Sequence, residues 1–474
     1  MNIISHFNKI LEESFNNFLR KNYYESNFWN KTASIDNYIN FMTDLDNFNS
    51  YFMINVIKSY FEYIDEIFFN TSYRRKYCTS NGFYSRTILT LFGEVTFKRR
   101  YYYDNKDKER FYFTDYFLNI PKRKYFDPFI CANLCEEAAS FSYSKSGKIV
   151  ANKIGKRINN NIYISRASVR NIIMNFNIDN DNYEENKKRI EKIFIMLDEK
   201  FVGSQFNNNK DHMIKAAVLF ENTELVYKYK KKESSVNRYR LVNPHTCASI
   251  DNELLNDTVN YIYNTYDVDY LKEINFMGDC ALWIKNFPKS NWFKFDNNIQ
   301  VNFSMDGFHF SQALGNLTTQ KYNDVYDALY EYVSNNNKED FTRLCNEFLD
   351  LFPERKDVIE LKRDYILNNW NERQFYLNHS YLKCSMESHI SHIFADLFTS
   401  RPKAYSKKGL RQLLKLRLLK VNNKDIKNMY FNNFRNKKIK VNHSSTYYCN
   451  DYDKYYNGIN FEKFFHFDNY INFI

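Results

Sequence analysis

Two carboxylates stand where metal-dependent chemistry on phosphodiesters could be built. Asp198 directly follows the apolar run 193–197, and Asp279 directly follows the run 274–278. An acid placed after a buried strand is costly unless it is paired or bound to a metal. If the two strands adjoin in a sheet, both carboxylates project at nearly the same height. Mg²⁺ prefers oxygen ligands, and two such ions can bracket the attacking and leaving oxygens of a phosphodiester. We therefore expect Asp198 and Asp279 to bind Mg²⁺, or Mn²⁺ in its place.

A third acid, Glu387, lies on one helical face with Ile390, Phe394 and Leu397. If this helix packs on the sheet, its carboxylate points inward as well and joins the metal ligands. Taken singly, each of the three acids is more often a strand-end cap or a loop residue. Their joint pattern is what favours a metal site.

The elements that must position these acids have the order of an α/β core. The strand candidates are EKIFIMLDEKFVG, MIKAAVLF, ELVYKYK, EINFMGD and NIQVNFSMD, with helices at Asp257 to Tyr266 and from FHFSQAL onward. Three consecutive strands followed by alternating helices and strands predict a ribonuclease-H-like mixed sheet flanked by helices. We expect this catalytic domain to span residues 190–400, with a helical insertion at about 320–380.

Three regions are expected before this domain. Residues 1–70 have the three- and four-residue apolar spacing of two or three amphipathic helices, suited to packing or dimerisation. Residues 71–125 alternate apolar with polar residues and predict a basic β-hairpin that turns at Gly93. Residues 126–180 predict a helix, a short polar connection and a second capped helix, which is the layout of a helix-turn-helix. Any two short packed helices share that outline.

Basic and polar side chains in these regions are candidate DNA contacts. Arg99 and Arg100 lie where basic and aromatic residues interleave, which suits phosphate neutralisation and base stacking. Arg166, Ser168 and Arg170 fall near the start of the second helix of the helix-turn-helix, where base edges and phosphates are met. We expect these five residues to bind DNA.

Positive charge is concentrated near the C-terminus. The chain carries a net charge of +11, and the segment from Arg401 to Lys440 alone holds fourteen basic residues against one acid, Asp425. Such a cluster is typical of contact with a polyanion, and nucleic acid is the first candidate. A solvated helix face or an unfolded basic tail would give the same count. The candidate DNA contacts in this basic C-terminal segment and tail, 401–474, are Lys407, Lys408, Arg411 and Lys415.

Length and composition exclude several classes of protein. A chain of 474 residues with 44% apolar residues can bury two to four cores, and 10 Gly and 6 Pro exclude collagen-like or Pro-rich architectures. The eight cysteines are scattered, so we expect reduced thiols and a cytoplasmic protein. No run approaches eighteen uninterrupted apolar residues, and the N-terminus lacks the cationic start of a signal peptide, so no membrane association is expected.

Several segments together resemble a known family. They are TLFGEVTFKRRYYYD, LDEKFVG, YRLVNPH, INFMGD with WIK, DGFH, and CSMESHISH followed by SRPKAYS. In order and spacing, from about Thr90 to Lys420, they are similar to the transposases of the Lre-type insertion-sequence family. That family is also catalogued as an uncharacterised UPF-type protein family, and it belongs with the Mutator-like DDE transposases. The catalytic domain of that group resembles ribonuclease H, with a helical insertion before the final acid.

The resemblance implies roles for individual residues. Asp198, Asp279 and Glu387 would be the DDE triad, and Asp306 with His309 would match the Asp-x-x-His signature that follows the second acid. The implied activity is Mg²⁺-dependent DNA cleavage and strand transfer at the ends of a bacterial insertion sequence. The implied partners are terminal inverted repeats, target DNA and a second copy of the chain, because both ends must be held together. The implied location is the nucleoid.

The chain departs from the family pattern at two places. Cys280 stands where a Gly-Asp-Gly turn would have its second glycine, and Ser388 stands where a glycine usually separates the last acid from a histidine. Neither change removes a carboxylate. Two alternatives remain compatible with these residues: a non-catalytic DNA-binding protein derived from a decayed transposase, and a ribonuclease-H-like nuclease without strand transfer.

Overall fold

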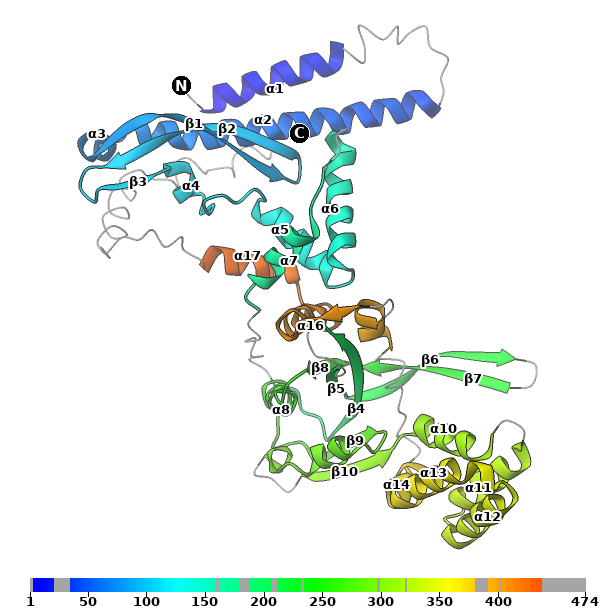
Figure 1. Ribbon diagram of the computed structural model, residues 1–474. Helices are drawn as coiled ribbons and strands as arrows, with labels where there is room; N and C mark the ends of the chain where they lie inside the picture. Colours follow the sequence, from blue (N-terminus) through cyan, green and yellow to red (C-terminus); the bar gives the residue numbers. More distant parts are fainter. Residues whose placement is uncertain are drawn as a thin grey trace. The chain divides into compact units, whose positions relative to one another are not determined.

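The structure is a computed structural model that describes most of the chain. The described residues are 3–20, 35–158, 162–178, 187–205, 211–231, 234–295, 299–319, 322–379, 391–399 and 403–436. The chain divides into two compact units (Figure 1). The first comprises Met1–Ala132, Lys148–Tyr163 and Tyr430–Ile474, and the second comprises Asn133–Gly147 and Ile164–Met429.

The first unit combines long helices with a three-stranded antiparallel sheet. Its elements are α1 (Ile3–Leu19), α2 (Ile35–Phe69), α3 (Ser72–Tyr77), β1 (Cys78–Thr90), β2 (Gly93–Asp104), β3 (Glu109–Phe111) and α4 (Phe113–Phe117). The hairpin expected at Gly93 is present, because β1 and β2 pair as far as Thr90 and Gly93. Gly93 has a φ of 130°, which favours glycine over other residues. Phe61 and Phe68 of α2 make edge-to-face contacts with Phe97 and Tyr102 of β2, respectively. These contacts hold the helix to the sheet.

Three helices run from one unit into the other: α5 (Pro128–Ala138), α6 (Tyr143–Ile158) and α17 (Ile426–Asn436). The second helix expected after Ser165 is α7 (Arg166–Met174). Ser165 caps it, since its Oγ accepts the Ser168 N–H at 3.0 Å. Gly147 of α6 lies against the entry to α7, and a Cβ there would come within 2.7 Å of the Ile164 carbonyl oxygen. The polar connection expected at 159–161 lies outside the described residues.

The second unit is built on one mixed sheet with the strand order β10-β9-β4-β5-β8. Its strands are β4 (Lys192–Ser204), β5 (His212–Phe220), β8 (His245–Ser249), β9 (Glu273–Gly278) and β10 (Gln300–Met305), and the short β11 (Ala404–Tyr405) pairs with β4. β5 lies antiparallel between β4 and β8, whereas β9 and β10 run parallel to β4 on its other side. The three parallel strands therefore end at the same edge of the sheet.

The third strand of this sheet differs from the sequence-based expectation. The segment ELVYKYK belongs to β6 (Asn222–Lys231), which pairs with β7 (Ser234–Val242) in a separate two-stranded ribbon that extends away from the sheet (Figure 1). The strand beside β5 is instead β8. β6 directly follows β5 and contains residues that favour strands, Leu225, Val226, Tyr227 and Tyr229, so local pattern alone could not tell which segment joins the sheet.

One face of the sheet is covered by α8 (Leu254–Thr265) and α9 (Leu282–Asn286). The alternate β4 residues Ile193, Ile195 and Leu197 point to this face and are fully buried in its core. The other face receives a helical segment with π-type hydrogen bonding, η6 (Ser391–Thr399), which packs against β4. Two faces buried against helices explain why β4 is an apolar run rather than an alternating one.

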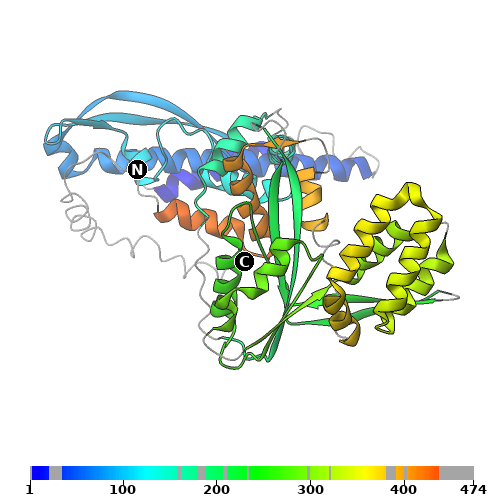
Figure 2. The ribbon, with the colours of Figure 1, turned by 60° about the horizontal axis from the view of Figure 1, so that its bottom comes forward.

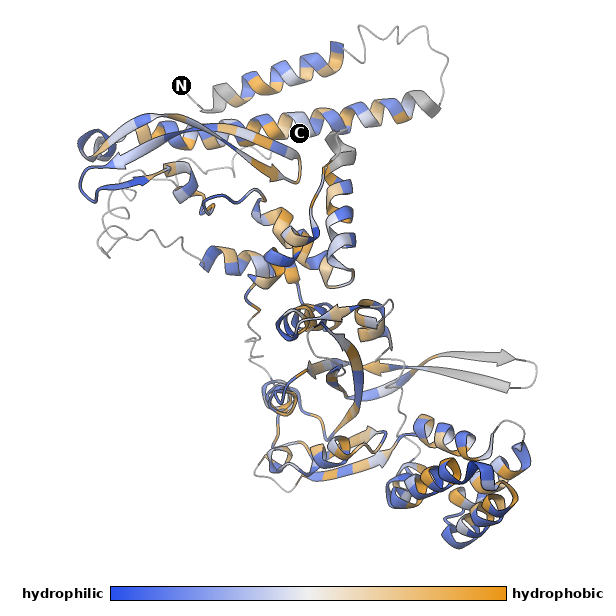
Figure 3. Cartoon of the chain, viewed as in Figure 1, coloured by the Kyte–Doolittle hydropathy of each residue, from blue (hydrophilic) through white to orange (hydrophobic). Residues whose placement is uncertain are grey.

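A bundle of helices follows β10 and has its own core. The helices are α10 (Gly307–Thr318), α11 (Asn323–Ser334), α12 (Lys338–Leu351), α13 (Lys356–Asn368) and α14 (Trp370–Asn378). They lie together beside the β10 edge of the sheet (Figure 2). Hydrophilic and hydrophobic residues alternate along each of them (Figure 3), as expected of amphipathic helices packed around buried Phe341 and Phe348.

The basic segment near the C-terminus is folded where the structure describes it. Helix α16 (Lys407–Val421) buries Leu410, Leu413, Leu416 and Leu419, and it packs against β8 and α7 within the second unit. Its cations are therefore carried by an amphipathic helix rather than by an unfolded tail. None of the helices in the described residues has an apolar stretch long enough to cross a bilayer.

Candidate active site

The parallel pairing of β4 with β9 brings two aspartates to one level. The pairing runs as far as Met196 and Met277, and an aspartate stands two residues after each of them: Asp198 within β4 and Asp279 directly after β9. The two aspartates are therefore at matching positions in neighbouring segments of the sheet. Residues two apart in a strand share a face, so both side chains project from the face opposite α8. The sequence-based expectation of equal height agrees with this register.

A third aspartate continues the row on β10. Met305 pairs with Gly278, and Asp306 follows Met305 as Asp279 follows Gly278. The Asp306 N–H donates to the Gly278 carbonyl oxygen at 3.1 Å, which extends the ladder by one bond. Asp279 and Asp306 thus directly follow β9 and β10, and Asp198 lies beside them in the middle of β4. We call these residues, together with His309, the acidic row.

Close packing at Gly278 sets the spacing of this row. A Cβ at Gly278 would lie 2.7 Å from Ile284 Cγ2 and 2.9 Å from the Leu197 carbonyl oxygen. Contacts this short require the backbone to shift. Only glycine lets the end of β9 approach β4 directly before the two aspartates.

We expect Gly278→Ala to destabilise the second unit by about 1–3 kcal/mol, because the added methyl group overpacks the junction of β9 with β4 and α9. Gly315→Ala in α10 is the matched control, since nothing lies within 4 Å of its Cβ position. That change should leave stability unchanged or raise it by roughly 0.5–1 kcal/mol, the helix preference of Ala over Gly. Urea unfolding of both variants measures the difference. Equal free energies of unfolding would contradict the packing argument.

Burial and like charge act on Asp198. Its side chain is half-buried, and its Oδ1 accepts the Glu199 N–H at 2.7 Å. Burial and the negative charges of Asp279 and Glu199 raise its pKa, the Glu199 N–H and His309 oppose the shift, and the net result is a pKa of about 6. A carboxyl group in this setting gains from a bound cation, because the cation would replace the lost solvent and offset the neighbouring charge.

Asp279 is held by its own turn and by the helical bundle. Its Oδ1 accepts the Ala281 N–H at 2.9 Å, and its carbonyl oxygen accepts the Tyr365 hydroxyl of α13 at 2.5 Å. The next residue, Cys280, has a φ of 65°, in the left-handed region that favours glycine. Cys280 therefore stands where a glycine would adopt the same backbone conformation without strain. Tyr365 was not predicted, because no local pattern links it to a turn 86 residues away.

Asp306 is fully engaged by helix α10. It is the N-cap: its Oδ1 accepts the His309 N–H at 2.8 Å, and its Oδ2 accepts the His309 Nδ1–H at 2.6 Å. Burial lowers the pKa of His309, but the hydrogen bond and charge of Asp306, with the charges of Asp279 and Asp198, more than compensate and raise it. Asp306 therefore fixes the orientation of the imidazole and, with the charges of the other two aspartates, favours its protonated form.

Glu387 lies outside the described residues. Four residues later the described chain resumes in η6, in which Phe394 and Leu397 are buried, as the sequence pattern expected. The segment has π-type hydrogen bonding, and its buried residues, Ile393, Phe394, Leu397 and Phe398, recur at a spacing of four and share one face. π-Helical turns are frequent at functional sites.

The chemistry of the acidic row fits a hard divalent cation. Asp198 and Asp279 present carboxylate oxygens whose recorded partners are backbone N–H groups. Mg²⁺ is commonly held by one or two carboxylates, its remaining positions being filled by water and substrate phosphate. Among the described residues, no three His, Cys, Asp or Glu side chains are grouped so as to hold a metal ion by themselves. The two aspartates would thus supply part of a ligand set.

The basic residues expected to bind DNA fall in three places. In the first unit, Arg99 and Arg100 are turned inward: Arg99 pairs with Asp115, and Arg100 bridges Asp65 and Glu66 at 2.8 and 2.7 Å. Both guanidinium groups hold β2 to neighbouring elements. Contact of either residue with DNA stays a prediction.

In the second unit, Arg166 and Arg170 are exposed on the first turns of α7, and Ser168 is half-buried against the cap. Both arginines lie close enough to the half-buried Tyr143 for their charges to act on its hydroxyl, although desolvation raises the pKa of Tyr143 overall. Their place at the start of a capped helix agrees with the position expected from the sequence.

The four cations of α16 differ in their surroundings. Lys407 and Arg411 both pair with Asp251, each at 2.6 Å, and they lower the pKa of that carboxyl group. Lys408 is exposed, and Lys415 is half-buried near enough to Asp257 to act on its charge. All four lie on a formed helix surface, two of them around one acid.

Comparison with known proteins places the chain in a family. The profile of an uncharacterised protein family, UPF0236, matches residues 43–434. A UPF0236 protein of Caldanaerobacter subterraneus subsp. tengcongensis, whose name joins eleven locus designations, is 25% identical over 362 residues, 74% of this chain and 71% of that protein. A second from the same organism, TTE0402, is 25% identical over 360 residues, 74% of this chain and 67% of its own length. A third, with four locus designations, is 25% identical over 360 residues, 74% of this chain and 71% of its own.

Proposed function

Because the chain belongs to the uncharacterised protein family UPF0236, its sequence and site are the grounds for a function, and we propose that it is a DDE-type DNA transposase. It would cleave DNA at the ends of its own mobile element and join the freed ends to target DNA. The observation that carries the proposal is the acidic row, in which Asp198 of β4 and Asp279, directly after β9, lie at one level where the parallel pairing of the two strands ends. A row of this kind suits a divalent cation beside a phosphodiester.

The proposed catalytic core is ribonuclease-H-like. The strand order β8-β5-β4-β9-β10 supports this proposal. β5 is antiparallel to both β4 and β8, and β9 and β10 are added on the other side of β4, parallel to it. The mixed sheet flanked by helices is the architecture that the element order of the sequence predicts. Glu387, which follows the helical bundle, is proposed as the third acid.

Each residue of the proposed site has a distinct part. Asp198, Asp279 and Glu387 would hold Mg²⁺ or Mn²⁺, and when bound the cation would activate the nucleophile and stabilise charge on the phosphate. Asp306 orients His309 and favours its protonated form, so that His309 would present a proton to a bound phosphate. That proton would stabilise negative charge as it develops on the departing oxygen. Tyr365 would act as a positioning residue, since it holds the turn that carries Asp279.

The names of the relatives add independent support. One relative carries eleven locus designations under one name, another carries four and a further one carries two. A protein encoded at many loci of one genome is what repeated copying of a mobile element would produce. By the same reasoning, the present chain would be encoded by a mobile element.

The direct test is cleavage of the DNA that flanks the gene. The full chain, with Mg²⁺ and a linear duplex carrying the gene borders, should nick the duplex at inverted repeats and join the freed 3′ ends to a second duplex. Cleavage without joined products would identify a nuclease rather than a transposase. Binding without cleavage would support the decayed, non-catalytic alternative.

Cation binding should depend on pH through Asp198. Its pKa is raised to about 6, so without a cation its charged form is disfavoured in the folded chain, and its contribution to stability falls as the pH rises from about 4 to 6. A cation must displace that proton. We expect Mn²⁺ affinity, measured by calorimetry, to rise with pH up to about 6 and then to level off. Affinity that is constant between pH 5 and 7 would contradict a role for Asp198 as a ligand.

A further inference from the structure

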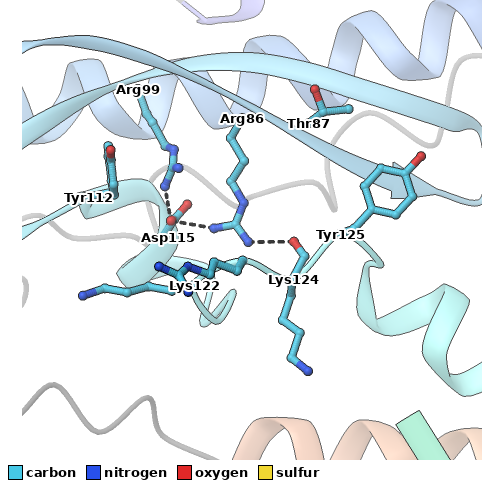
Figure 4. Close-up of a pocket in the computed structure, with 9 residues that line it drawn as sticks. Arg86, Thr87, Arg99, Tyr112, Asp115, Lys122, Lys124 and Tyr125 are labelled. Atoms are coloured by element: carbon cyan, nitrogen blue, oxygen red, sulfur yellow. Dashed lines mark hydrogen bonds and ion pairs between the residues drawn. The ribbon is translucent and has the colours of Figure 1, made fainter. Parts of the chain in front are cut away.

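A cavity of about 390 Å³ in the first unit concentrates positive charge (Figure 4). Its cationic lining residues are Arg86, Arg99, Lys122, Arg123 and Lys124, and its acid is Asp115. Arg86 comes from β1 and Arg99 from β2, the two strands of the hairpin. The other three cations come from the segment after α4. Five cations facing one acid in so small a volume indicate a site for an anion.

The inner part of this cavity has a buried excess of positive charge. Arg86 and Arg99 are each 8% exposed, and both guanidinium groups converge on the carboxylate of Asp115 (Figure 4). One carboxylate cannot neutralise two guanidinium groups, so one positive charge remains in a desolvated place. Such a charge is costly unless a further anion offsets it.

A buried donor in the cavity also has no partner. Among the described residues, the Nε of Arg99 is hidden from solvent and makes no hydrogen bond, and the same holds for Asp115 Oδ1. The guanidinium group of Arg99 lies 3.6 Å from the ring centre of Tyr112, which fixes its plane. A rigid, partly unsatisfied guanidinium group is well suited to bind a phosphate oxygen.

The outer cations are held in place by Arg86. Its Nη2 donates to the carbonyl oxygens of Pro121 and Lys124, each at 2.9 Å, so one side chain closes the turn between them. Arg123 in this turn has a φ of 61°, a conformation that non-glycine residues rarely adopt without a structural reason. The turn keeps Lys122 and Lys124 exposed at the mouth of the cavity.

We propose that this cavity, the phosphate pocket, binds a backbone phosphate of duplex DNA, with Arg99 beneath the phosphate and Lys122 and Lys124 at its sides. Two lysines at the mouth suit a continuous strand better than a buried small anion, because they can neutralise flanking phosphates as well. The inference rests on the proposed function only for the choice of DNA as the polyanion. The acidic row takes no part in it.

The test compares two double variants of the full chain in EDTA, which removes any dependence on the acidic row. Lys122→Gln with Lys124→Gln alters the phosphate pocket, and Lys98→Gln with Lys108→Gln removes two exposed charges elsewhere in the same unit. Affinity for a 30-base-pair duplex is measured across a salt series. We expect about tenfold weaker binding for the pocket variant, with a salt slope shallower by about 1–2. The control should change affinity less than twofold.

Three outcomes would overturn the inference: equal losses in both variants, no binding by the parent chain, or unchanged binding by the pocket variant. Inorganic phosphate distinguishes the sources of the anion. If millimolar phosphate raises the melting temperature of the parent but the pocket variant still binds DNA normally, the site takes free phosphate instead. DNA binding that depends on the pocket, together with failed cleavage, would leave this inference standing and overturn only the proposed function.

Discussion

Asp198→Asn, Asp279→Asn and Glu387→Gln should each lower the rate of DNA cleavage by about 10³-fold or more, equivalent to about 4 kcal/mol of transition-state stabilisation. Each change keeps the size of the side chain but removes a charged oxygen ligand. Because Asp198 and Asp279 each stand two residues beyond the last paired residues of adjoining strands, loss of either should disable the same cation site. The measurement is single-turnover cleavage of the gene-border duplex with Mg²⁺.

Glu199→Gln is the matched control for these variants. Glu199 is the neighbour of Asp198 in β4 but points to the opposite face, where its carboxylate accepts the indole N–H of Trp283. A glutamine can accept the same hydrogen bond, so we expect cleavage within about threefold of the parent, or less than 1 kcal/mol. Equal loss in Glu199→Gln and Asp198→Asn would show that general negative charge, and not the acidic row, matters.

Asp115→Asn should cost the first unit about 3–5 kcal/mol of stability, because two buried guanidinium groups would lose their shared counter-charge. Asp115 contacts both Arg86 and Arg99, and burial raises its pKa against the opposing effect of these two arginines. Hydrogen exchange of the β1 and β2 amides in the full chain reports the change locally.

Glu66→Gln provides the comparison within the same unit. Glu66 pairs with Arg100, but its side chain is 50% exposed, so water can replace the lost charge. We expect a change of about 0–1 kcal/mol in the same exchange measurement. If Asp115→Asn were as mild as Glu66→Gln, the arginine pair would not depend on Asp115, and the excess charge inferred for the phosphate pocket would lose its basis.

Much of the local structure follows from local sequence. Gly93 between alternating segments predicts the β1–β2 hairpin, and Ser165 before an apolar helical pattern predicts the start of α7. Asp198 and Asp279 stand out because each ends a buried apolar run, and parallel strands place such residues together. These features depend on chain neighbours or on a simple rule of sheet geometry, so one sequence suffices to predict them.

Other features depend on contacts between distant segments. The sequence pattern could not show that β8 rather than β6 joins the sheet, since both follow β5 with suitable composition. It also could not show that Tyr365 holds the Asp279 turn or that Arg99 turns inward to Asp115. A surface arginine and a buried one look the same in sequence, because the difference lies in what the tertiary fold brings beside them.

The proposed DNA cleavage requires a divalent cation held between Asp198 and Asp279. Electron paramagnetic resonance of Mn²⁺, titrated into the full chain at pH 7 without DNA, measures this directly. We expect saturable binding in the parent and in Glu199→Gln, and loss of that binding in both Asp198→Asn and Asp279→Asn. Binding that is the same in all four proteins, or absent from the parent, would contradict the proposed chemistry.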